Sequence, residues 1–182
     1  MTKLLEFNDI WTFPHGDGGV DVSWRFIEKN LEMMADGTTL DLDPDFQRGH
    51  VWTEEQQRAF VEFVLRRGDV AKTILFANVA PPKSWHGHWG ELSLVDGKQR
   101  LEAVRSLTRG DLTVFHDHRP GGYHWSELHE SLTSRVHASL RFTVVNLPNR
   151  EAVLDLYLAL NAGGTPHTVA ELDRVRALRA KL

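Results

Sequence analysis

The segment from Leu92 to Arg109 is the part of the sequence that most constrains the fold. An apolar run ends at the common turn dipeptide Asp96-Gly97, and apolar residues then recur at helical spacing at Leu101, Val104 and Leu107. Gly110 follows at the position of a typical helix C-cap. The pattern predicts a strand, a tight turn and a helix in immediate succession, so the fold must combine strands with helices.

The predicted turn brings polar side chains to the start of this helix: Asp96, Lys98, Gln99 and Arg100. Unpaired backbone N–H groups and the positive end of the helix dipole favour an anion there. Cations in a first turn are unfavourable unless an anion is shared, and phosphate is the obvious candidate. The alternative is that Asp96 is only a turn and capping residue, which is a common role for aspartate.

Composition narrows the class of protein. The 182 residues suffice for one well-buried domain, and the formal net charge of -4 argues against a protein that coats nucleic acid by bulk electrostatics. The absence of cysteine excludes disulfides, iron–sulfur clusters and a cysteine nucleophile. The first residues lack the apolar core of a signal peptide, and no stretch reaches the ~20 apolar residues of a membrane span. We therefore expect a cytoplasmic protein without a membrane partner.

Strands and helices follow one another along the chain without regular alternation. Residues 1–22 are expected to be irregular, because glycine and proline interrupt them. Strands are expected at 38–42, 72–79, 112–115 and 139–147, and helices after Ser23, after the capping boxes at Thr53–Gln56 and Thr168–Glu171, and after Asn149. This order predicts an α+β or mixed α/β fold with helices packed on a small sheet.

Large side chains are concentrated in the loop from Phe46 to Trp52. In the simpler account Phe46 and Trp52 anchor the loop to the core while Gln47 and Arg48 are solvated; in the other account the loop carries function, as loops often do. The paired histidines of other loops, such as His86 and His88, lack further ligands at a spacing typical of a metal site.

The order of these motifs resembles one family. Phe46-Gln47-Arg48 precedes a capped helix and a strand, Val95 to Leu101 (VDGKQRL) follows, and Asn161 to Pro166 (NAGGTP) precedes the final helix. Over about residues 38–175 the chain resembles the N-terminal domain of GmrSD-type modification-dependent restriction enzymes, which belong to the ParB/sulfiredoxin-like fold group. The resemblance implies an extension with a packing helix at residues 1–37 and a ParB-like nucleotide-binding domain at residues 38–182, in one compact body.

The resemblance also implies a nucleoside triphosphate bound with a divalent ion, Mg²⁺, and hydrolysed in several members. The loop matched by Asp96 to Arg100 lies at the nucleotide phosphates in that family, and the loop matched by Gln47-Arg48 supports the same pocket. The usual family motif is Asp-Gly-Gln-Gln-Arg, so Lys98 is a departure here. Lysine can still contact phosphate as a point charge. Larger members also carry a His-containing nuclease domain, and we expect no such domain within these 182 residues.

Individual roles follow as hypotheses. Arg100, with Arg48, would neutralise phosphate oxygens, and Gly97 and Lys98 would lie beside them. Asp96 would act on a water molecule or help to hold Mg²⁺.

Other residues of the site complete this assignment. Gln99 or Gln47 would orient the attacking water. Asn161 and Thr165 would close the far side of the pocket.

Other functions use the same motifs differently. A phosphotransferase of the ParB-like type would pass the phosphoryl group to a hydroxyl of DNA or of a small acceptor. A non-catalytic module would sense DNA or contact a separate effector protein, with phosphate contacts from basic residues that could equally form a solvated surface: Arg135, Arg141, Arg174, Arg176 and Arg179.

Overall fold

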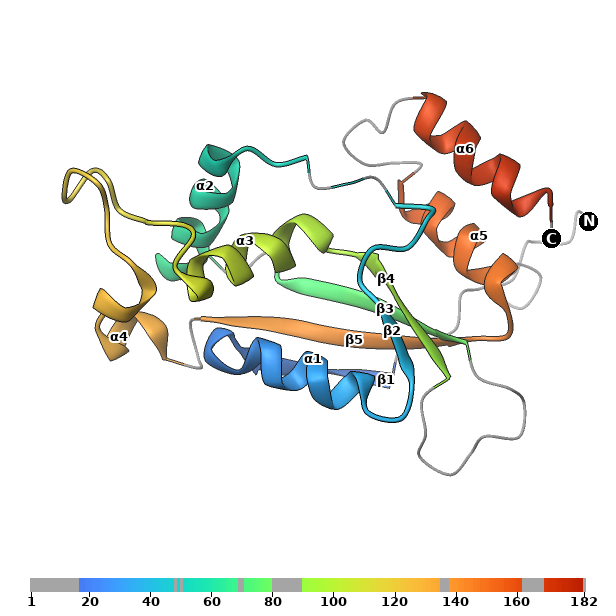
Figure 1. Cartoon of the computed structure of the whole chain (residues 1–182), viewed down its shortest axis with the longest axis horizontal. Coiled ribbons are helices and arrows are strands. Elements are labelled where there is room, and N and C mark those ends of the chain that lie inside the picture. The colour runs from blue at the N-terminus through green and yellow to red at the C-terminus, as the bar shows by residue number, and fades with distance from the viewer. Residues whose placement is uncertain are drawn as a thin grey trace, which may run out of the picture.

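The computed structural model describes residues 17–47, 49, 51–68, 71–79, 90–134, 138–161 and 169–181. Within them a five-stranded sheet has the order β1-β5-β3-β4-β2 (Figure 1). β3 and β5 are parallel, as are β2 and β4, whereas β1 with β5 and β3 with β4 are antiparallel. The strands are β1 (Asp17–Ser23), β2 (Thr39–Asp41), β3 (Thr73–Val79), β4 (Glu91–Asp96) and β5 (Ser139–Leu147).

Helices connect the strands and confirm the expected α+β class. α4 lies at one end of the molecule and α6 at the other (Figure 1). The helices are α1 (Ile27–Ala35), α2 (Glu54–Leu65), α3 (Lys98–Arg109), α4 (Glu130–Thr133), α5 (Arg150–Asn161) and α6 (Val169–Arg179), with the 3-10 turns η2 (Trp24–Phe26) and η3 (Trp125–Glu127). None of these helices is long and apolar enough to cross a membrane.

Two predicted helix starts have the capping geometry that the sequence indicates. The Thr53 hydroxyl accepts from the Gln56 backbone N–H, and the Gln56 side chain accepts in return from the Thr53 backbone, which completes the capping box of α2. Asn149 Oδ1 accepts from the Ala152 N–H at 3.0 Å before α5. Local sequence therefore determines where these helices begin.

Two cores lie on opposite faces of the sheet. Successive strand residues point to opposite faces, and in β3 Ile74 and Phe76 join a cluster with α1, α2 and α3, while Ala77 joins another with α5 and α6. β4 divides in the same way, with Leu94 in the first core and Val95 in the second. The central strands are thus buried on both faces, which explains why they read as continuous apolar runs.

Three local expectations were wrong. Residues 17–22 are not irregular, because Asp17–Ser23 forms the edge strand β1 on β5. Residues 112–115 form no strand: only Val114 bridges, to Tyr123, and Phe115 has a φ of 60°. Ser23 precedes the 3-10 turn η2 but its side chain makes no capping bond.

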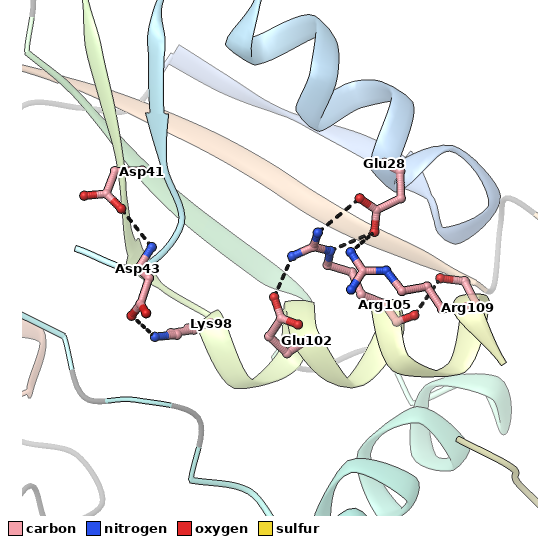
Figure 2. A network of polar contacts seen from close by, with 8 residues as sticks. Glu28, Asp41, Asp43, Lys98, Glu102, Arg105 and Arg109 are labelled. Carbon is pink, nitrogen blue, oxygen red and sulfur yellow. Dashed lines mark hydrogen bonds and ion pairs between the residues drawn. The ribbon is translucent and has the colours of Figure 1, made fainter. Parts of the chain in front are cut away.

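A network of ion pairs joins α1 to α3 (Figure 2). Glu28 on α1 accepts from Arg105 Nε at 2.7 Å and from Arg109 at 2.9 Å, and Arg105 also reaches Glu102 at 2.6 Å. The hydrogen bond from Arg105, with a smaller contribution from Arg109, holds the pKa of the Glu28 carboxyl below its usual range. The network fixes the helix whose N-terminus opens the candidate site.

Candidate functional site

A cleft of about 450 Å³ lies where β4 ends and α3 begins. Its walls also come from the loop before α2, from α2 itself and from the C-terminal end of α5. It is lined by Gln47, Trp52, Phe60, Ala71, Val95, Asp96, Gly97, Lys98, Gln99, Arg100, Tyr157, Leu160 and Asn161. Segments more than 100 residues apart in the sequence thus meet in one concave surface.

The cleft brings together most of the residues that the sequence singled out. Those present are Gln47, Asp96, Gly97, Lys98, Gln99, Arg100 and Asn161. Arg48 and Thr165 lie outside the described residues.

Gly97 makes the turn from β4 into α3. Its φ of 95° lies in the left-handed region that side chains disfavour. A Cβ at this position would lie 2.7 Å from Ile74 Cδ1 and 3.0 Å from the Thr73 carbonyl oxygen. Glycine is therefore required both by the backbone conformation and by the close approach of β3.

The two cations of the first helical turn are each paired with a carboxylate. Lys98 Nζ contacts the Asp43 carboxylate (Figure 2), and Arg100 donates to Asp96 Oδ2 at 2.5 Å and to the Ala71 carbonyl at 3.1 Å. Asp96 does not cap α3 with its side chain, since Gly97 is the N-cap and no side-chain capping bond is present. Asp96 is instead the partner of Arg100, and its side chain is 53% exposed.

The two glutamines hold loop and strand together. Gln99 Oε1 accepts from the backbone N–H groups of Val51 and Trp52 at 3.0 and 3.1 Å, and its Nε2 donates to the Gly49 carbonyl at 3.2 Å. Gln47 is buried, and its side-chain amide donates to the Leu94 carbonyl. An amide oxygen has two lone pairs, so the Gln99 oxygen has no acceptor capacity left for a water.

Aromatic side chains line part of the cleft. Trp52 and Phe60 are in contact, with ring centroids 5.6 Å apart, and Tyr157 and Leu160 of α5 also line it. No sequence signal distinguishes Phe60 and Tyr157 from core residues, because they occupy the apolar positions of amphipathic helices. Trp52 belongs to a loop for which the sequence allows both an anchoring role and a functional one.

The basic residues proposed for DNA contact are largely engaged within the protein. Arg174 donates to the Gln47 carbonyl at 2.7 Å, Arg176 pairs with Asp173, and Arg179 pairs with Asp155. Arg141 lies 3.6 Å from Asp21, and Arg135 is outside the described residues. Within the part of the chain described, these arginines do not form an unopposed basic surface.

The side chains of the described residues indicate what kind of metal site the cleft could offer. The described residues contain no group of three or more histidine, aspartate or glutamate side chains that could hold one, and His86 and His88 are not among them. Mg²⁺ in nucleotide sites is usually held by one or two carboxylates together with substrate phosphates. Asp96, half exposed in the cleft, fits that arrangement, whereas the described residues offer no site built from protein ligands alone.

A family model described as "GmrSD restriction endonuclease, N-terminal domain" matches residues 27–139. The chain belongs to this family. Membership relates it to the restriction of DNA, and the match includes Gln47 and the whole stretch from Asp96 to Arg100. It ends before α5, so the wall that carries Tyr157 and Asn161 lies beyond it. Neither the curated proteins nor the solved structures contain a match to the chain.

Proposed function

We propose that this GmrSD-type domain binds a nucleoside triphosphate with Mg²⁺ in the cleft at the end of β4 and hydrolyses it as part of a DNA-restriction system. The observation that carries the proposal is the joint presence in one cleft of Lys98, Arg100 and the N-terminus of α3. This set of groups suits an anion of high charge.

On binding, the phosphates would replace the carboxylates that now pair with Lys98 and Arg100. Lys98 and Arg100 are held by Asp43 and Asp96, so no cation has to be recruited into the cleft. A triphosphate would take over these cations, and the released Asp96 carboxylate would be free for Mg²⁺ or for a water molecule. The ion would supply charge neutralisation for the phosphates.

The base and ribose would lie against the aromatic wall. Trp52 and Phe60 offer apolar aromatic surface beside the phosphate-binding end, and stacking on aromatic rings is a general way to hold a base. Lys98, which replaces the family's glutamine, would add a point charge at the phosphates.

Hydrolysis would depend on Asp96 rather than on the glutamines. Gln99 and Gln47 are committed to the loop and to β4, so we assign them a positioning role. Asp96 has one carboxylate oxygen on Arg100 and a half-exposed side chain, which suits a group that accepts a proton from water.

The test is the melting temperature of the chain with ATP, GTP or CTP and Mg²⁺, together with release of inorganic phosphate. A ligand that binds only the folded state at 100 times its dissociation constant contributes about 2.7 kcal/mol, which raises the melting temperature of a domain of this size by about 5–10 °C. No shift with any of the three nucleotides would contradict binding. A shift without phosphate release would contradict hydrolysis alone.

A further inference from the structure

A second cavity, of about 570 Å³, lies away from the cleft and has no role in the proposed nucleotide site. It is formed by the C-terminal end of α2, the segment 115–123, η3 and α4. It is lined by Leu65, Arg66, Arg67, Phe115, His118, Tyr123, Glu127, Leu128, His129 and Leu132. None of the described residues lines both spaces, so an occupant of one would not touch the walls of the other.

The size and lining of this cavity match those of small-molecule sites, which are mostly apolar spaces of about 300–1,000 Å³ with a few polar groups. Leu65, Leu128 and Leu132 supply aliphatic surface, and Phe115 and Tyr123 supply aromatic surface. An arginine lies over each ring: Arg66 is 5.1 Å from the Phe115 centroid and Arg119 is 3.9 Å from the Tyr123 centroid. An occupant would meet both aliphatic and aromatic surface.

Backbone strain is concentrated at these two spaces. Among the described residues other than glycine, Arg67, Ala71 and Phe115 have positive φ, at 68°, 60° and 60°. Ala71 lines the cleft, whereas Arg67 and Phe115 line the second cavity. Glu62 holds Phe115 in place by accepting from its backbone N–H at 2.6 Å. Such conformations cost free energy and are found preferentially at ligand sites.

Arg67 is the unusual residue of the pair. It follows the C-cap of α2, a position at which glycine is the common choice, and its backbone N–H donates to the Val64 carbonyl. Its guanidinium makes no hydrogen bond or ion pair within the part of the chain that the structure describes. No polar contact of this side chain with another described residue therefore offsets the strain of its backbone.

The other charges around the cavity are already balanced. Arg119 binds Glu127 through both carboxylate oxygens at 2.9 and 2.8 Å and lowers the pKa of Glu127 to about 2. Arg66 pairs with Asp117 at 3.0 Å. Among the described residues, Arg67 thus has no carboxylate partner, and it adds a positive charge at the rim.

His129 adds a hydrogen-bond donor. Its Nδ1 accepts from the Ser131 backbone N–H at 3.2 Å, so in the neutral ring the proton lies on Nε2. Arg67 and His129 Nε2 are thus two hydrogen-bond donors at this cavity.

We propose that this cavity binds a small aromatic organic anion: the ring system would pack on the leucines and against Phe115 and Tyr123, and the anionic group would bind Arg67 and His129. Ring-to-ring contact favours an aromatic body over an aliphatic one. The assignment is independent of the nucleotide proposal, because it uses other residues and another ligand.

Titration of the full chain with anilinonaphthalene sulfonate, an aromatic anion whose fluorescence reports an apolar site, tests the proposal. The wild-type chain should show saturable fluorescence and a higher melting temperature with the probe. Excess Mg-ATP should leave the titration unchanged, whereas competition would assign the probe to the cleft and overturn the proposal.

Two variants and one control sharpen the test. Arg67→Gly should weaken probe binding by about tenfold, the size expected for one charge-assisted contact, while the melting temperature without the probe stays level or rises because glycine relieves the strain. Leu128→Trp fills the cavity and should abolish binding. Arg176→Ala removes a cation elsewhere and should change nothing. Wild-type affinity in both cavity variants, or a probe that lowers the melting temperature, would overturn the proposal.

Discussion

At the scale of single residues, Gly97 determines the geometry of the candidate site most directly. Gly97→Ala combines a positive φ with a Cβ 2.7 Å from Ile74, so we expect a loss of about 2–4 kcal/mol in the free energy of unfolding. Gly110→Ala is the matched control: Gly110 has a φ of 90° but open space around its Cβ, and the loss should be about 1 kcal/mol. Urea unfolding of both variants measures the difference, and equal losses would contradict it.

Gln99 is expected to act through the loop it holds. Gln99→Ala removes acceptors from the amides of Val51 and Trp52, so the exchange of these two amide protons with deuterium should accelerate by about tenfold or more. The amides in the middle of α3 should keep their protection. Unchanged exchange at Val51 and Trp52 would show that the loop is held by other contacts.

At the scale of elements, the contact of α1 with α3 should depend on pH. The folded-state pKa of Glu28 is lowered, so its ion pairs stabilise the protein fully above the ordinary carboxyl value of 4.5 and are lost as the pH falls through the lowered pKa. Glu28→Gln should therefore be less stable than wild type at about pH 7, by no more than about 1 kcal/mol because the pair is partly exposed, and the two should converge as the pH falls through the lowered pKa of Glu28. Melting curves across this range measure the difference, and a constant gap would contradict the assignment.

Elements with local signals could be predicted, and those defined by distant partners could not. Short contiguous stretches of sequence were enough to predict the capping box at Thr53, the Asn149 cap and the strand Ser139–Leu147. β1 was missed because its glycine-rich sequence is extended only through its pairing with β5. Gly19 lies close against β5, since a Cβ there would lie 2.6 Å from Arg141 Nε.

At the scale of the whole molecule, the cleft combines one predictable wall with others that only folding reveals. Asp96 to Arg100 could be recognised because these residues are contiguous and lie at a helix start. The contributions of Phe60, Ala71 and Tyr157 depend on how α2, the segment before β3 and α5 pack around that start, and nothing in their local sequence separates them from core positions. The same holds for the second cavity, whose strained residues have no signature in the sequence.

The most direct test of the central claim is the dissociation constant of nucleoside triphosphate with Mg²⁺ for two variants of α3. Arg100 lines the cleft, whereas Arg109 lies at the opposite end of the same helix and pairs with Glu28. Arg100→Ala should weaken binding by about 10- to 100-fold, as expected for the loss of hydrogen bonds from a charged group to phosphate. Arg109→Ala should bind as wild type does. Equal affinities in the wild type and the two variants would show that the nucleotide does not bind in this cleft.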